Sequence, residues 1–177
     1  NLDVNQNDAD YAPLMLADYM LGSGDGFDSR LMARIRVKDG LSYGVSSQLQ
    51  GSIFDRAGGW TVQAIAAPQN VPKVEAALRD ELDRARRDGF TDDEIAKAKS
   101  GWVQRFAQIR VQDQQLAGRL LSNLDSGRTF VTWDKAFEAR VLAVTPEQVR
   151  VAVRKNIDQD KLTIVKKNDF DKVAKAT

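Results

Sequence analysis

The sequence predicts an α+β fold in which helices pack on one small antiparallel sheet. Helical and strand patterns do not alternate regularly along the chain, which disfavours a doubly wound parallel sheet. The two clearest strand patterns also follow one another directly, as the arms of a hairpin do. With 177 residues, 42% of them hydrophobic, the chain can bury a substantial core. We therefore expect residues 1–177 to form a single domain.

Glycines punctuate the predicted helices of the first forty residues. A helix is expected at about residues 10–21, with Pro13 in its first turn, followed by a glycine-rich loop at residues 22–26. Ser29 is the expected N-cap of a second helix, which Gly40 ends just beyond Lys38.

The start of the chain carries only a weak strand signal, at Leu2 and Val4, which predicts an edge strand that is cut short before Asn1. The chain also begins with Asn1 rather than Met, as a processed or truncated product does. We therefore expect it to be a fragment of a longer polypeptide.

Two segments with strand patterns predict the hairpin. Residues 41–49 alternate with a period of two, and residues 60–66 are rich in strand-forming side chains; the break at Asp55–Gly59 lies between them. Alternation places one set of side chains on a common face of the first strand, namely Leu41, Tyr43, Val45, Ser47 and Leu49.

Capping signals define the helices of the second half. Asn70 and Gly89 bracket a helix, and Thr91 with Glu94 forms a capping box that starts a long helix. Polar residues interrupt its apolar face and predict a bend near residue 111.

The last third of the chain predicts two short helices and a strand. A helix is expected at residues 133–142, and a second capping box at 145–148 opens a helix to about Asn156. Residues 162–165 read as a strand that joins the hairpin, followed by a polar tail.

Composition excludes several classes of function. The chain contains no His and no Cys, so it offers neither histidine zinc ligands nor Ser-His or Cys-His nucleophile pairs. Carboxylates alone could still hold Mg or Ca or perform acid/base work, but we expect this chain to bind no metal. A net charge of +1 provides no general attraction for nucleic acid. No apolar run of membrane-spanning length occurs, so we expect no membrane insertion.

Several local patterns have simpler explanations than a functional site. The loop at residues 22–26 lacks the Lys-Ser/Thr of a phosphate cradle, and Asp25 with Asp28 lacks the spacing of a calcium loop. Charges at residues 80–87 indicate a solvated helix face, and Trp102 with Phe106 at helical spacing indicates core.

Arg36 and Tyr43 are the candidate site. Arg36 belongs to the last turn of the second helix and Tyr43 to the entrance of the following strand, so the turn at Gly40 can bring both to one rim. A guanidinium and a phenol are hydrogen-bond donors suited to a carbonyl oxygen or a developing oxyanion. Taken alone, the commoner explanation is that Arg36 complements a helix C-terminus and Tyr43 packs half-buried in a sheet.

The segment from residue 29 to residue 44 resembles a signature of the C-terminal domain of insulinase-like (pitrilysin) zinc metallopeptidases of the bacterial processing-peptidase type. In that family a helix ending in Leu-or-Ile-Arg leads through a Gly-Leu-Ser-Tyr turn into a strand, as Ile35-Arg36 and residues 40–44 do here. Order and spacing agree over nearly the whole chain, at residues 10–13, 19–22, 29–31, 67–71, 88–94 and 142–149. The C-terminus departs, because Lys166 and Lys167 replace a hydrophobic ending.

This resemblance implies a metallopeptidase half-domain of the insulinase-like or mitochondrial-processing-peptidase type. In the family an N-terminal domain holds zinc through a His-x-x-Glu-His motif, and the second domain closes over the peptide substrate without binding metal. Arg36 and Tyr43 would be the catalytic and substrate-binding residues, acting on the carbonyl held at that zinc. Zinc would belong to the missing N-terminal domain of the same chain or to a partner subunit, and this chain alone would be inactive.

Two further expectations follow from the same kinship. Bacterial relatives are often exported, which favours a periplasmic location. The alternative function is that of a non-catalytic structural or assembly subunit of the same fold, in which Arg36 and Tyr43 serve only packing.

Overall fold

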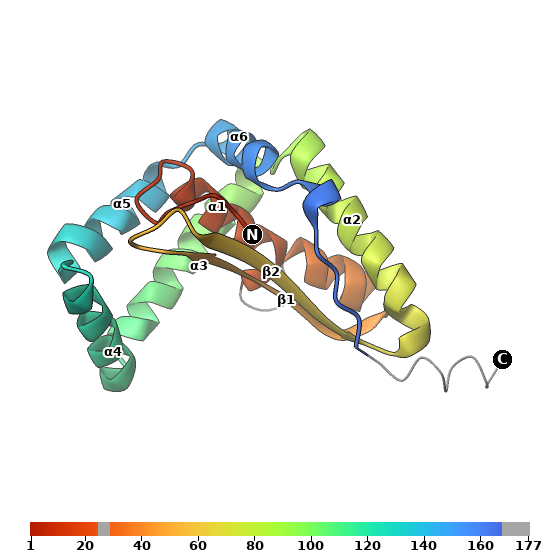
Figure 1. Cartoon of the computed structure of the whole chain (residues 1–177), viewed down its shortest axis with the longest axis horizontal. Helices are drawn as coiled ribbons and strands as arrows, with labels where there is room; N and C mark the ends of the chain where they lie inside the picture. Colours follow the sequence, from red (N-terminus) through yellow and green to blue (C-terminus); the bar gives the residue numbers. More distant parts are fainter. Residues whose placement is uncertain (25–28, 168–177) are drawn as a thin grey trace.

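The computed structural model describes residues 1–24 and 29–167, and its elements follow the order expected from the sequence (Figure 1). The elements η1, η2 and η4 are π-helical, whereas η3 and η5 are short 3-10 turns. The bounds are α1 Tyr11–Asp18, η1 Tyr19–Ser23, η2 Met32–Lys38, β1 Ser42–Gly51, β2 Gly58–Ala66, η3 Pro68–Asn70, α2 Val71–Asp88, α3 Asp92–Arg110, α4 Asp113–Asp125, η4 Phe130–Lys135, α5 Ala136–Ala143, α6 Pro146–Asn156 and η5 Gln159–Lys161.

The sheet is an antiparallel hairpin of β1 and β2, which confirms the predicted α+β class. Its register runs from Ser42 opposite Ala66 to Gly51 opposite Gly58. The N-terminal strand signal gives only isolated bridges, of which Leu2 with Gly58 is antiparallel. The predicted strand at residues 162–165 is wrong, because this segment is extended but pairs with no strand in the described part of the chain. A strand needs a backbone partner, and strand-forming side chains alone do not provide one.

Helices cover the hairpin on one face. The helical segments α1, η1 and η2 pack against β1, and α2 packs against β2, while α6 bridges α1 and α2 (Figure 1). Val45 is buried on this covered face. The opposite face carries exposed polar side chains, among them Ser46, Gln48, Thr61 and Gln63. This half-covered arrangement is common for antiparallel sheets.

A buried carboxyl group joins the first helix to both strands. Asp18, at the end of α1, is 6% exposed. It accepts hydrogen bonds from the Ser47 hydroxyl at 2.5 Å, the Leu49 amide at 3.1 Å and the Trp60 indole N–H at 2.7 Å. The approach of helix and strand is close, since a Cβ on Gly22 would lie 2.7 Å from Ser47 Oγ. Asp18 therefore fixes which face of the hairpin meets the helices.

The capping boxes occur where the sequence predicts them. Thr91 and Glu94 open α3, and Thr145 and Gln148 open α6, with the hydroxyl and the N3 side chain each bonded to the other residue's amide. The predicted bend is a break at Val111, between α3 and α4.

Three predictions about charged or polar side chains are wrong. Ser29 makes no side-chain cap, because its buried hydroxyl has no hydrogen-bond partner among the described residues. Asn70 makes no side-chain cap; its amide instead donates to the Leu41 carbonyl at 3.3 Å and ties the start of α2 to the hairpin. Glu81 is 3% exposed rather than solvated, and its carboxylate lies 2.8 Å from the Arg84 guanidinium. Trp102 is buried as expected, and Phe106 is half-buried and stacks on it.

An ion pair ties the start of α3 to residue 30. The Arg30 guanidinium donates to both Glu94 oxygens, at 2.6 and 2.8 Å, and to the Gly89 carbonyl at 3.0 Å. Burial would raise the pKa of Glu94, but the hydrogen bonds from Arg30 and from the Thr91 amide outweigh it and lower that pKa to about 2. The Arg30 guanidinium also lies over the Phe90 ring.

We expect Asp18→Ala to lower the free energy of unfolding by about 3 kcal/mol, because it leaves buried donors on both strands without an acceptor. Urea denaturation followed by circular dichroism measures this change. Asp55→Ala, which removes an exposed carboxylate, is the matched control and should change stability little. Equal stability of the two variants would contradict the role of Asp18.

We expect Glu94→Gln to cost about 1–2 kcal/mol at neutral pH, a range reduced from the full pKa shift because the carboxylate is partly exposed. The folded-state pKa is depressed, so the stabilisation is complete above the unfolded pKa near 4.5 and is lost as the pH falls toward about 2. Unfolding measured at several pH values should show the wild type and the variant converging at low pH. A gap that stays constant down to pH 2 would refute this assignment.

Candidate functional site

The turn that leads from η2 into β1 positions both candidate residues. The amide of Asp39 donates to the Arg34 carbonyl at 3.0 Å, and the amide of Leu41 donates to the Ile35 carbonyl at 2.8 Å. Gly40 between them has a φ of 61°, a conformation that disfavours a side chain. These bonds hold the entrance of β1 directly against the last helical turn, which contains Arg36.

A bulge at the start of β1 determines the direction of Tyr43. The register shifts between Ser42 and Gly44, so Tyr43 is inserted into the ladder without a partner. The Ser42 hydroxyl lies 2.8 Å from the Gly44 carbonyl and 2.7 Å from the Ile65 carbonyl, and it accepts from the Gly44 amide at 3.2 Å. Ser42 is only 9% exposed, so its hydroxyl fastens the bulge from within.

The bulge overturns the predicted side of Tyr43. Regular alternation places Tyr43 on the covered face with Val45, but the structure turns it out, with 82% of its surface exposed. Arg36 is exposed as well. Large apolar side chains are exposed at the same end of the hairpin, at Val37 and Ile65. The turn therefore presents a cation and a hydroxyl at the same end of the hairpin as two exposed apolar side chains.

The charged side chains of Arg34 and Asp39, beside the turn, pair with each other. Asp39 accepts a hydrogen bond from Arg34 at 2.6 Å, and this bond raises the pKa of the Arg34 guanidinium. Both side chains are partly exposed, so this ion pair adds little to stability and mainly fixes the conformation of the turn. A cationic side chain in the last turn of a helix interacts favourably with the carbonyl groups at the helix C-terminus.

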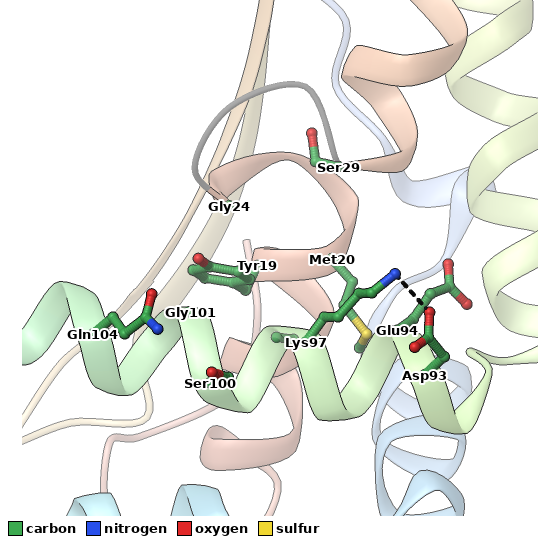
Figure 2. A pocket seen from close by; sticks show the side chains of 11 residues that line it. Tyr19, Met20, Gly24, Ser29, Asp93, Glu94, Lys97, Ser100, Gly101 and Gln104 are labelled. Atoms are coloured by element: carbon green, nitrogen blue, oxygen red, sulfur yellow. Dashed lines mark ion pairs between the residues drawn. The ribbon is translucent and has the colours of Figure 1, made fainter.

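A cavity of about 440 Å³ lies elsewhere, between η1 and the first half of α3. Figure 2 shows the Tyr19 ring over Gly101, where any side chain would collide with the tyrosine. The carboxylate of Asp93 is paired with Lys97 at 2.8 Å, and that of Glu94 is bonded to Arg30. Neither Arg36 nor Tyr43 lines this cavity. The first of these pairs lies within α3, and the second joins α3 to residue 30.

Gly22 and Gly24 serve close packing, against Ser47 and against Tyr19 respectively. The rest of the phosphate candidate, and Asp25 and Asp28 of the calcium candidate, lie outside the described residues.

A zinc ion does not fit the residues of this chain. The sequence has no His and no Cys, and no group of three potential ligands gathers within residues 1–24 and 29–167. In that same part of the chain, no helix has the length and apolarity that a membrane crossing requires.

Sequence reasoning named Arg36 and Tyr43 as candidates but missed Ser42, whose hydroxyl holds the bulge that turns the tyrosine outward. A local signal was present, since a serine between a left-handed glycine turn and a Tyr-Gly pair can bond to backbone two residues on. The second half of its role, the contact with the Ile65 carbonyl 23 positions away, has no local signature.

Comparison with known proteins identifies the family of this chain. A family model described as "Peptidase M16 inactive domain" matches residues 2–101. An uncharacterised zinc protease of Streptomyces coelicolor is 35% identical over 136 residues, which cover 74% of this chain and 28% of that protein. The chain thus spans well under half the length of this relative.

Solved structures show the same fold. The peptidase M16 inactive domain from Pseudomonas fluorescens is 26% identical with a TM-score of 0.68, covering 90% of this chain and 37% of that one. The periplasmic protease PqqL from Escherichia coli is 20% identical with a TM-score of 0.58, covering 88% of this chain and 16% of that one. The chain belongs to the peptidase M16 family, as the C-terminal, inactive domain of an insulinase-like zinc protease.

Proposed function

We propose that this domain supplies the substrate-binding, transition-state-stabilising wall of a zinc metalloendopeptidase, with Arg36 and Tyr43 as the residues that contact the scissile peptide. The observation that carries the proposal is the bulge at Ser42–Gly44, which turns Tyr43 away from the core at the same end of the hairpin as Arg36. A tyrosine used only for packing would not be 82% exposed.

The chemistry proposed for the two side chains is hydrogen-bond donation to one oxygen. The Arg36 guanidinium and the Tyr43 hydroxyl would donate to the scissile carbonyl in the bound peptide. Negative charge grows on that oxygen as the carbonyl carbon becomes tetrahedral, so both hydrogen bonds strengthen at the moment of reaction. Neither residue takes or gives a proton in this scheme.

Exposure explains why such donors would need a second domain. In water a guanidinium and a phenol are well solvated, and an added hydrogen bond contributes little. When an opposing domain closes over the peptide it excludes that water, and the same donors act more strongly on the oxyanion. The proposal therefore makes this chain inactive alone and couples substrate enclosure to catalysis.

The proposed partner is the N-terminal domain of the same polypeptide or a partner subunit, which would bind the zinc ion that does not fit here. The substrate would be a peptide. We also propose a periplasmic location, because of the family resemblance. The periplasmic protease of Escherichia coli, at 20% identity, shares the fold.

We expect Arg36→Ala and Tyr43→Phe in the complete enzyme each to lower kcat/KM by about 30- to 1000-fold, which corresponds to about 2–4 kcal/mol of transition-state stabilisation. Peptide hydrolysis under steady-state conditions measures the loss. Lys38→Ala removes another exposed cation near the same helix end and is the matched control, with expected activity near that of the wild type.

Unchanged turnover in both variants would favour the alternative, a structural or assembly subunit of this fold. Thermal unfolding should be unaffected by either change, because both side chains are exposed.

We expect Ser42→Ala to act through Tyr43. Loss of the hydroxyl frees the bulge, so Tyr43 samples other directions and kcat/KM falls by about tenfold, within the range that misplaced catalytic groups show. In a Tyr43→Phe background the same change should have little further effect, because the hydroxyl it aims is already gone. Fully additive losses in the double variant would instead mean that Ser42 acts on the fold.

A further inference from the structure

The bulge places two consecutive residues of β1 on the face of the hairpin opposite the helices, which we call the open face. Ser42 and Val45 are buried, and Tyr43 and Gly44 lie between them. Because the register shifts at this point, Tyr43 and Gly44 together oppose one residue of β2, Ile65. The three residues therefore meet at one end of the hairpin.

Ile65 is an exposed aliphatic side chain among polar ones. Side chains alternate along β2, so Ile65 shares the open face with Thr61 and Gln63, whereas Val62 points to the side covered by α2. Ile65 also borders the groove between β2 and α2, but it is 71% exposed. Most of its apolar surface is thus available to a ligand.

Gly44 leaves bare backbone beside Ile65. Its φ lies outside the left-handed region, which in the described part of the chain contains Gly40, Gly89 and Gly127. A Cβ added to Gly44 would meet nothing within 4 Å. Neither backbone conformation nor packing within the described residues therefore requires a glycine here, although glycine weakens a strand. The close approach of a ligand is a further reason for a glycine in a strand.

We propose that Tyr43, Gly44 and Ile65 form a notch that receives an apolar side chain of the peptide substrate, at the residue that carries the scissile carbonyl. This inference rests on the function proposed above, in which the Tyr43 hydroxyl donates to that carbonyl. The side chain of the same residue leaves from the atom bonded to the carbonyl carbon, so it lies close to the tyrosine. Gly44 leaves room for it, and Ile65 provides apolar contact.

The chemistry of the notch selects an apolar occupant. None of its three residues is acidic or basic. The Ser42 hydroxyl already bonds to the Gly44 amide, the Gly44 carbonyl and the Ile65 carbonyl. A polar side chain entering the notch would therefore lose hydrogen bonds to water and find few replacements, whereas an apolar side chain loses none.

The test measures peptide selectivity in the complete enzyme. Two fluorogenic peptides differ only in the residue that carries the scissile carbonyl, which is Leu in one and Gly in the other. Gly44→Ala puts a methyl group into the notch and should lower kcat/KM about tenfold for the Leu peptide, with little effect on the Gly peptide. Ser46→Thr adds a methyl group further along the open face and is the matched control, with both peptides cleaved as by the wild type.

A second variant tests the apolar contact itself. Ile65→Thr keeps a β-branched side chain but removes apolar surface, and it should reduce the preference for the Leu peptide over the Gly peptide by about tenfold. Urea denaturation checks the fold of both variants. Gly44→Ala should unfold at the wild-type urea concentration or above it, because its methyl group meets open space and alanine restricts the unfolded chain.

Equal losses for the two peptides in Gly44→Ala would mean that this residue acts only by positioning Tyr43, and unchanged selectivity in both variants would mean that the notch receives no side chain. Either result overturns the inference. Arg36→Ala distinguishes such a failure from that of the proposed function, because it should slow hydrolysis of both peptides alike. If it does so while selectivity at the notch is unchanged, the notch alone is rejected. If Arg36→Ala has no effect, the proposed function is refuted, and this inference falls with it.

Discussion

The fold depends most on one buried carboxyl group. Asp18 accepts hydrogen bonds from both strands of the hairpin, and in the described part of the chain it pairs with no basic side chain. Its stabilisation therefore depends on the placement of neutral hydrogen-bond donors and not on an ion pair. A buried acceptor of this kind is tolerated only where its donors are correctly placed. It therefore sets both the distance of the hairpin from α1 and the face that β1 turns inward. The outward direction of the other side chains of β1 is therefore set by the position of Asp18.

Two local features of the backbone then position the proposed site on β1. Gly40 reverses the chain at the end of η2, and the Ser42 bulge then rotates one residue out of the alternating pattern. The result is a rigid turn that exposes a guanidinium and a phenol without burying either. Solvent-exposed donors on a fixed backbone suit a wall that becomes catalytic only when another domain covers it, which fits an inactive domain of a two-domain zinc protease.

Local sequence signals predicted the features that are locally determined. The capping boxes at Thr91 and Thr145 depend on residues three positions apart, and they occur as expected. The side of Tyr43 could not be predicted, because the bulge depends on a contact between Ser42 and the distant Ile65 carbonyl. Nor could the burial of Glu81, which depends on what packs against α2. The absent strand at residues 162–165 shows the same limit, since pairing depends on a neighbour and not on propensity.

The family and the fold class were thus accessible from the sequence, and the roles of Arg36 and Tyr43 stay predictions, whereas the direction of the tyrosine required coordinates. The most direct measurement is a crystal structure of the parent enzyme with a phosphinic peptide, whose tetrahedral phosphorus imitates the addition intermediate. The account predicts that the Arg36 guanidinium and the Tyr43 hydroxyl each lie within about 3.2 Å of one phosphinyl oxygen. Both side chains pointing into solvent, away from the bound inhibitor, would contradict it.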